Sequence, residues 1–200
     1  MLTIKMKNLL ILVIAMLPMF SSSCQAQKVD NSTIKSMDVR KYLGQWFEIA
    51  RFDHSFERGV YFPKAEYSMN ADGTIKVTNS GIKNGKTHIS IGKAKLTDTV
   101  GLFRVSFFGP FYSDYRVMML SDDYQYALVG SKSKKYLWIL SRSITIPNDI
   151  RKQILDEAGR RGYAVEDLMW MDQTKEFKAI TSAMDNLNLW GNLAYLTQSR

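Results

Sequence analysis

The sequence predicts an all-β fold, an eight-stranded antiparallel up-and-down barrel with one α-helix packed against its outside. Three observations lead to this prediction. Residues 42–142 form short segments in which apolar and polar side chains alternate, which is typical of half-buried strands. Turn sequences such as Asp72-Gly73 and Asn84-Gly85 separate these segments and favour tight hairpins. A single stretch with helical spacing of its apolar residues follows the last segment.

The predicted strands follow one another with short connections, so consecutive strands are expected to pair as hairpins. Their ranges are 45–52, 64–70, 74–82, 87–96, 102–108, 114–120, 126–131 and 136–142. A meander of eight strands can bury both of its edges by closing into a barrel. Such a barrel has an interior that holds packed side chains or one small ligand.

The helix is predicted at about residues 148–161. Pro147-Asn148-Asp149 supplies capping and acidic residues at its positive end, and Arg160, Arg161 and Gly162 close it. Residues 168–172 are predicted as a ninth short strand that pairs back onto the first.

Composition bounds the class of protein and its partners. The chain has 200 residues, of which 46% are hydrophobic and 12% aromatic, which suits one domain with a packed core. The net charge of +8 indicates attraction to anionic surfaces such as phospholipid headgroups. Lysine and arginine are spread along the chain without a basic stripe, so we do not expect nucleic acid as a partner.

The first 23 residues are predicted to be a signal peptide. Lys5 and Lys7 precede an apolar run at residues 9–20 that is short for a membrane span. Small residues then lead to Cys24, the only cysteine, an arrangement that resembles a bacterial lipobox in which the thiol is acylated. Ser21 stands where leucine is usual, and ordinary cleavage, for example after Ala26, is the alternative.

This reading of the N-terminus divides the chain and predicts its location. Residues 24–36 are expected to form a tether, residues 37–173 the barrel, and residues 174–200 a C-terminal extension. Because Gln25 and not aspartate follows the cysteine, the sorting pattern implies the cell outer membrane, with lipid anchoring. A soluble periplasmic or secreted protein is the alternative.

Several motifs, in order, resemble the lipocalin family, and within it the bacterial outer-membrane lipoprotein branch and the related apolipoprotein D. The resemblance covers Met37 to about Gln173. The motifs are Gly44-x-Trp46, the segment 53–59 (DHSFERG), Asp72-Gly73-Thr74-Ile75-x-Val77, the segment 107–111 (FFGPF), Asp114-Tyr115 after Ser113, and the segment 136–142 (YLWILSR). Ser113 stands where the family usually has threonine.

The resemblance implies structural roles for five residues: Gly44, Trp46, Asp114, Tyr115 and Arg142. In the family the tryptophan plugs the closed end of the barrel, and the arginine of the last strand lies over its indole. Asp114 is expected to support the same end through backbone hydrogen bonds. None of these is expected to be catalytic or to contact a ligand.

The resemblance also implies that the barrel binds or transports fatty acids, lysophospholipids or similar hydrophobic ligands at the envelope. If the first strand is regular, Glu48 and Ala50 share the side of Trp46, and Glu48 is either ligand-facing or turned to solvent by a kink. Together with residues on other strands, the expected lining residues are Glu48, Ala50, Tyr67, Val77, Ile91, Phe107 and Tyr126. For each one the alternative is packing on the outer face.

Two other functions stay open on the sequence alone. One is a structural or interaction module of the envelope whose interior is too full for a ligand. The other is a lipid-modifying enzyme, but residues 37–200 hold no cysteine nucleophile, and we see no hydrolase, zinc or phosphate-binding motif. We therefore predict no catalytic residue, metal or cofactor.

The extension at 174–200 carries apolar residues at helical spacing, beginning with Phe177 and Ile180, and more near its end. Exposure of such a segment would be unfavourable. It is expected to pack on the barrel, cover the mouth, join a homodimer interface or lie in a membrane surface.

Overall fold

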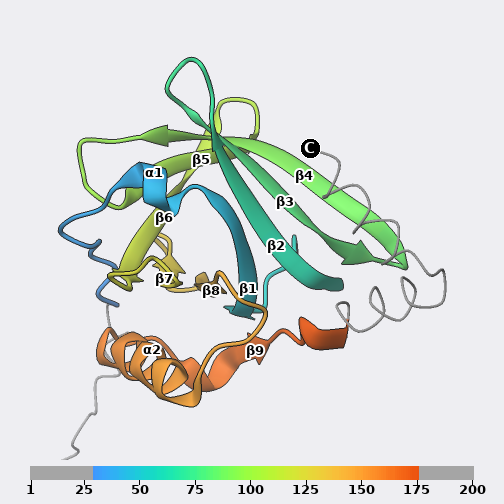
Figure 1. Ribbon diagram of the computed structural model, residues 1–200, viewed down its shortest axis with the longest axis vertical. Coiled ribbons are helices and arrows are strands. Elements are labelled where there is room, and N and C mark those ends of the chain that lie inside the picture. The colour runs from blue at the N-terminus through green and yellow to red at the C-terminus, as the bar shows by residue number, and fades with distance from the viewer. Residues whose placement is uncertain (1–28, 176–200) are drawn as a thin grey trace, which may run out of the picture.

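The computed structural model describes residues 29–175 and shows strands curling around a common interior, with one long helix outside them (Figure 1). The strands are β1 (Gly44–Phe52), β2 (Val60–Met69), β3 (Ile75–Lys83), β4 (Lys86–Leu96), β5 (Leu102–Phe108), β6 (Phe111–Leu120), β7 (Tyr126–Gly130), β8 (Leu137–Ser141) and β9 (Leu168–Trp170). The helices are α1 (Val39–Tyr42), α2 (Asn148–Arg160) and the 3-10 turn η1 (Val165–Asp167).

The first eight strands form a closed antiparallel barrel. Each of β2 to β8 pairs with its neighbours in chain order, and β1 closes the ring by pairing with both β8 and β2. The short β9 continues the sheet by pairing with the end of β1. The predicted fold class is therefore confirmed.

Two strands begin three or more residues earlier than the sequence predicted. The prediction began the second strand at residue 64 because Pro63 lacks an N–H donor. The pairing of β2 with β3 is irregular between Tyr61 and Lys64, so Pro63 sits where no donor is required and the strand begins at Val60. The sixth strand begins at Phe111 instead of residue 114, which makes the β5–β6 connection a two-residue hairpin.

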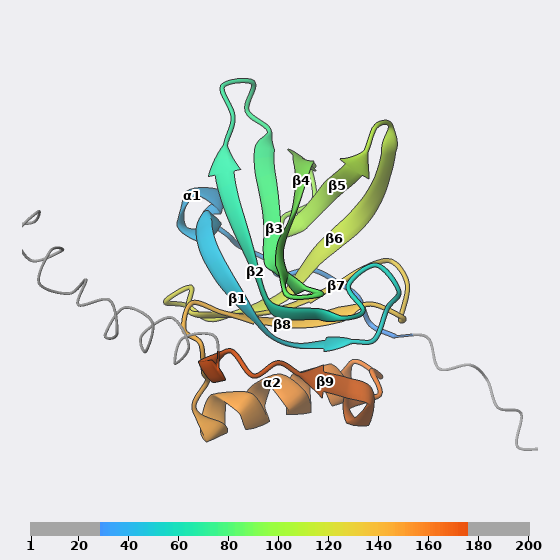
Figure 2. The same cartoon turned by 90° about the vertical axis from the view of Figure 1, so that its right-hand side faces the viewer.

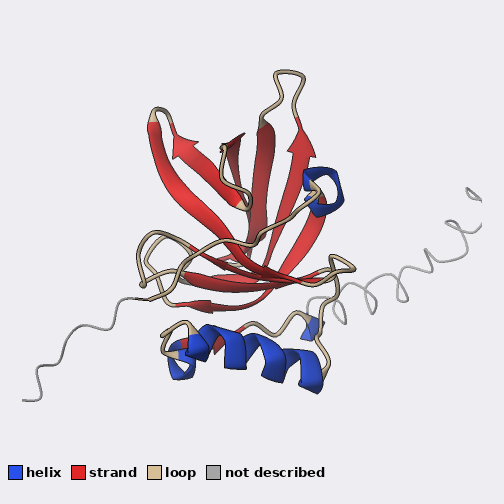
Figure 3. Cartoon of the chain, turned by 90° about the vertical axis from the view of Figure 1, so that its left-hand side faces the viewer, coloured by secondary structure: helices blue, strands red, loops and turns tan. Residues whose placement is uncertain are grey.

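The buried side chains form two clusters on opposite faces of the barrel wall. The interior cluster includes Trp46, Tyr67, Val77 and Phe103. The helix-side cluster joins the outer face of β1 and β6–β8 to Ile154 and Ala158 of α2. Figure 3 shows α2 lying along the outside of the strands. The helix therefore covers the outer face of one wall and does not fill the barrel interior.

The N-terminal segment lies against the barrel from residue 29 onward, although the sequence predicted a tether up to residue 36. The backbone N–H of Asp30 donates to Arg161 (2.9 Å), and that of Ile34 donates to Val117 (3.0 Å). Arg161 is buried and donates to the carbonyls of Ser32 (2.8 Å) and Met118 (2.9 Å). The predicted signal peptide, Cys24 and all but the first two residues of the extension lie outside the described residues.

The barrel wall is incomplete between β4 and β5. These strands pair only from Lys93 opposite Ser106 to Leu96 opposite Phe103. Residues 86–92 of β4 therefore pair with β3 alone.

Candidate ligand-binding interior

One end of the barrel is closed by Trp46 and Arg142. The guanidinium carbon of Arg142 lies 3.9 Å from the centre of the fully buried Trp46 ring. The same guanidinium donates to the carbonyls of Gln45 (2.6 Å), Lys41 (2.9 Å) and Leu43 (2.8 Å). Since these bonds join β8 to the start of β1, this end is held shut and is not open to a ligand.

Gly44 permits the backbone conformation beside this clamp. Its φ of +90° is strained for any residue with a side chain, and a Cβ there would lie 3.5 Å from Arg142 Nη1.

Three tyrosines form the floor of the interior above this clamp. The hydroxyls of Tyr42 and Tyr67 lie 2.6 Å and 3.0 Å from that of Tyr115. Burial raises the pKa of Tyr67 to about 12. The hydroxyls satisfy one another, so the floor offers aromatic surface with its polar atoms already paired. Tyr42 comes from α1 and was not singled out in the sequence.

Asp114 differs from its predicted role. The expectation was backbone hydrogen bonding at the closed end, but its carboxylate pairs with Arg104 and with Arg116 Nη2 (2.8 Å for Arg116). Arg116 in turn donates to the carbonyl of Asn31 (3.3 Å). Asp114 therefore holds the outer wall and the N-terminal segment.

A bulge in β1 changes which residues face inward. The register with β8 shifts between Glu48 and Ala50, so the strand is not regular there. Ala50 consequently lies in the helix-side cluster and not beside Trp46, and Arg51 moves to the inner side opposite Trp138. Regular alternation would have put Arg51 on the outer side, so the sequence did not single it out as an interior residue.

The bulge brings a buried charge cluster together, made of Glu48, Arg51, His54 and Glu57. Arg51 is 1% exposed and donates to Glu48 Oε1 at 2.5 Å, while its Nε lies 3.8 Å from Glu57 Oε2. Trp138 Nε1 donates to the same Glu57 oxygen (3.2 Å). Two carboxyl groups thus share one guanidinium away from solvent.

This sharing perturbs the protonation of both acids. Burial, followed by the nearby Glu57 carboxyl, raises the pKa of Glu48 to about 8. Burial also raises the pKa of Glu57. Because the two groups interact, one proton is held by the pair near neutral pH.

His54 and its aromatic neighbours cover this cluster. Its ring stacks on Phe56 (centroids 4.0 Å apart) and lies near Trp138 (5.3 Å) and Tyr136 (5.6 Å). Burial, followed by Arg51, lowers the pKa of His54 to about 4. Its Nε2 is 3.1 Å from Glu57, yet neither ring nitrogen makes a hydrogen bond to a described residue. The segment 53–59 is therefore an aromatic flap over a polar patch in the barrel interior.

The predicted lining residues fall into two groups. Tyr67 and Val77 lie in the interior cluster, and Phe107 packs against it. Ile91 is 61% exposed because Gly92, its neighbour, pairs opposite the inward-facing Val77.

Tyr126 packs at the helix-side cluster, since Ala127 and Val129 take the inner positions of β7. Ala50, Ile91 and Tyr126 therefore do not line the interior, whereas Glu48, Tyr67, Val77 and Phe107 do.

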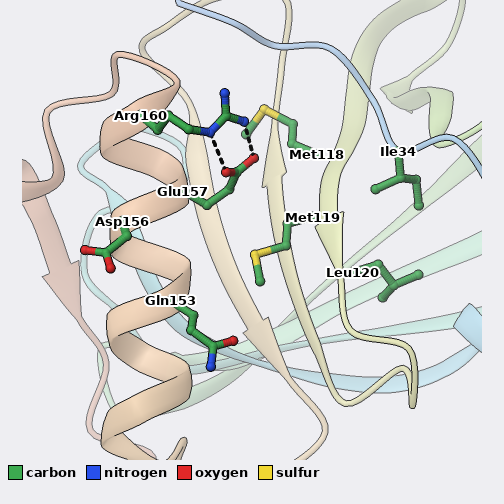
Figure 4. A pocket seen from close by; sticks show the side chains of 8 residues that line it. All are labelled: Ile34, Met118, Met119, Leu120, Gln153, Asp156, Glu157 and Arg160. Atoms are coloured by element: carbon green, nitrogen blue, oxygen red, sulfur yellow. Dashed lines mark hydrogen bonds and ion pairs between the residues drawn. The ribbon is translucent and has the colours of Figure 1, made fainter.

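A separate hollow of about 530 Å³ lies outside the barrel, between α2 and β6 (Figure 4). Met118 and Met119 approach it from β6, and Glu157 and Arg160 face it from α2 while pairing with each other at 2.7 and 2.8 Å. A second hollow of about 520 Å³ lies beside the gap between β4 and β5, and its lining includes Lys93, Phe107 and Tyr112. Neither contains a residue of the charge cluster.

Within residues 29–175 no helix is long and apolar enough to cross a membrane. The same residues bring no three histidine, cysteine, aspartate or glutamate side chains into a group that could hold a metal ion.

Comparisons with known proteins agree with this architecture. A family model described as a lipocalin-like domain matches residues 37–173. The outer membrane lipoprotein Blc of Escherichia coli is 42% identical over 146 residues, which cover 71% of this chain and 82% of that protein. Mouse apolipoprotein D is 31% identical over 150 residues, which cover 70% and 78%.

The solved structure of insecticyanin from the tobacco hornworm shares the fold, with a TM-score of 0.60 over 72% of this chain and 84% of that one. Its sequence identity is 22%, so this likeness concerns the fold alone. The motifs, the closed barrel and these matches lead to one conclusion: the chain belongs to the lipocalin family.

Proposed function

We propose that the barrel interior binds fatty acids, lysophospholipids or similar amphiphiles at the bacterial envelope. Lipocalins as a family bind small hydrophobic ligands, and the Blc relatives are named outer membrane lipoproteins. The observation that carries the proposal is the division of the interior into an aromatic floor and a buried polar cluster beneath the flap 53–59.

This division suits an amphiphile. An acyl chain gains about 0.8 kcal/mol for each methylene group removed from water, and Tyr67, Val77 and Phe107 supply apolar surface for it. A polar headgroup would then lie toward Arg51 and Glu48, which can donate and accept hydrogen bonds once a ligand displaces part of the flap.

Native mass spectrometry of delipidated protein mixed with micromolar palmitate tests this role. We expect a one-to-one adduct that Phe107→Ala weakens, because the Phe107 ring packs inside the barrel. Phe108→Ala is the matched control, since the adjacent ring is 81% exposed. Absence of any adduct, or equal weakening by both substitutions, would contradict interior binding.

We propose a binding role and not catalysis. Lipocalins are generally binding proteins, and residues 37–200 contain no cysteine that could act as a nucleophile inside the barrel. A second candidate, an envelope module that binds no ligand, is favoured by the close packing of Tyr42 on Trp46 (centroids 4.9 Å apart) and Tyr67 (5.6 Å). The palmitate experiment separates these two functions.

The proposed location rests on acylation of Cys24, which would anchor the chain in the outer membrane. Mass measurement of the mature N-terminus would show a diacylated cysteine, and Cys24→Ser would abolish it. Cleavage beyond Cys24 would instead give the soluble periplasmic or secreted protein. A homodimer also remains a prediction, which sedimentation of the mature chain would test.

A further inference from the structure

Four large aromatic side chains are exposed in or directly beside the connections between strands of this barrel. Phe108 is 81% exposed and Phe111 79%, on either side of the β5–β6 hairpin. Tyr61 is 65% exposed at the start of β2, and Phe56 is 57% exposed in the flap. Phenylalanine rings this exposed are unfavourable in water, and clusters of them mark surfaces that meet a partner or a membrane.

These rings lie at the end of the barrel opposite the Trp46–Arg142 clamp. In an up-and-down meander alternate connections share an end, so segments 53–59, 84–85, 109–110 and 131–136 lie at the open end. Figure 2 shows the β5–β6 hairpin and the loop after β1 on the same side of the molecule, away from α1. The exposed aromatics therefore surround the mouth.

The same end carries a strong positive charge. Its connections and their flanks contain Lys83, Lys86, Lys132, Lys134 and Lys135. The only acidic residues in the four connections are Asp53, which pairs with Arg58 at 2.5 Å, and the largely buried Glu57. Among residues 29–175 none of these lysines pairs with a carboxylate, and a surface of exposed aromatic rings among such lysines complements an anionic lipid interface.

The N-terminal segment leads to this end as well. Asn31 Nδ2 donates to the carbonyls of Ser131 and Lys132, both at 3.1 Å. Five peptide units separate Cys24 from Val29, and they span at most about 17 Å. The anchor that belongs to the proposed function would thus hold the open end, and not the clamp, next to the bilayer.

We propose that the open end of the barrel docks on a bilayer that contains anionic phospholipid. Phe108 and Phe111 insert among the acyl chains, and the lysines of segments 83–86 and 132–135 lie at the phosphate groups. The mouth then faces the lipid surface, with Phe107 directly behind the inserted hairpin on the inner side of the wall.

Vesicle sedimentation tests this surface with the whole mature chain carrying Cys24→Ser, so that no acyl anchor contributes. Vesicles are made of phosphatidylglycerol and phosphatidylcholine in equal amounts, or of phosphatidylcholine alone. We expect binding to the mixed vesicles that Phe108→Ser with Phe111→Ser weakens at least about tenfold. The matched control replaces Leu96 (45% exposed) and Val100 (43% exposed) by serine at the clamped end, and it should bind as the parent does.

Charge provides an independent measurement. Replacing Lys132, Lys134 and Lys135 by glutamine should weaken binding to the mixed vesicles about a hundredfold, since each lysine near an anionic surface contributes on the order of 1 kcal/mol. Sodium chloride at 0.5 M should have a similar effect.

No binding by the parent, unchanged binding by the Phe108/Phe111 variant, or equal loss in the Leu96/Val100 control would overturn the proposal. Palmitate binding in solution is measured for each variant. If the parent bound no palmitate, the ligand role would be refuted, while the docking proposal would be unaffected.

Discussion

Replacing Glu48 by glutamine should remove a pH dependence of stability that comes from the buried charge cluster. Glu48 lies against Arg51 with Glu57 nearby, and its pKa in the fold is about 8 against an ordinary 4.5. A raised carboxyl pKa means that the folded state binds more protons than the unfolded state between these two values. Stability therefore falls as pH rises through this window.

The magnitude follows from the two pKa values. Between pH 6.5 and 8 the Glu48 carboxyl should lower the unfolding free energy by on the order of 1–2 kcal/mol. The pKa of His54 is about 4 in the fold against an ordinary 6.5, so His54 acts in the opposite direction. Over the same pH range it raises the unfolding free energy by a few tenths of a kcal/mol. The parent should thus lose about 1 kcal/mol, and Glu48→Gln should lose less, because only Glu57, whose pKa burial also raises, still gives up a proton on unfolding.

Urea unfolding followed by tryptophan fluorescence at pH 6.5 and 8 measures this difference. Glu66→Gln is the matched control, because Glu66 is exposed on the outer face of β2. It should keep the full slope of the parent. The reasoning is refuted if Glu48→Gln loses as much stability over this pH range as the parent does.

Three further substitutions test other parts of the fold. Arg142→Leu should lower the unfolding free energy by about 3 kcal/mol, because it leaves several carbonyls at the clamped end without a donor. Urea titration measures this loss, and an unchanged midpoint would show that the clamp does not stabilise the fold. Gly92→Ala should lower the thermal midpoint of unfolding, because the new Cβ would lie 2.8 Å from the Phe107 ring and 2.7 Å from a backbone oxygen. An unchanged midpoint would mean that the Phe107 ring does not lie against Gly92. Gly159→Ala should raise the unfolding free energy by about 0.5–1 kcal/mol, because Gly159 lies in α2 and no atom of another segment is within 4 Å of the new Cβ. Calorimetry measures the change, and a decrease would contradict the open surroundings of Gly159.

The sequence predicted the fold because hairpin turns and alternation are local signals that agree along the chain. It placed Trp46 and Arg142 together only through the family resemblance, since nothing local links residues 96 positions apart. The interior was harder to predict. Ala50 and Arg51 lie on the faces opposite to those expected, because one bulge shifts the alternation of all later residues in the strand. No residue type near Glu48 predicts this bulge.

Apolar character also misassigned residues on the other walls. Ile91 was expected inside because it is an apolar residue in the alternating pattern of the fourth strand. The glycine beside it faces the interior instead and leaves room for Phe107. Tyr126 was expected inside and instead packs on the helix side, because α2 supplies a second apolar environment outside the barrel. A strand that is covered on both faces carries no period-2 signal to show which face is inner.

The one-sided pairing of β4 gives this barrel a seam that can widen. Residues 86–92 already lack partners on β5, so separating the two strands there breaks no ladder hydrogen bonds and loses only side-chain contacts. In a barrel whose strands are paired along their whole length, backbone hydrogen bonds would have to break before a bulky ligand could enter. Here the circumference can adjust at low cost beside Phe107. Under the proposed function, this would let one interior accept acyl chains of different length and branching.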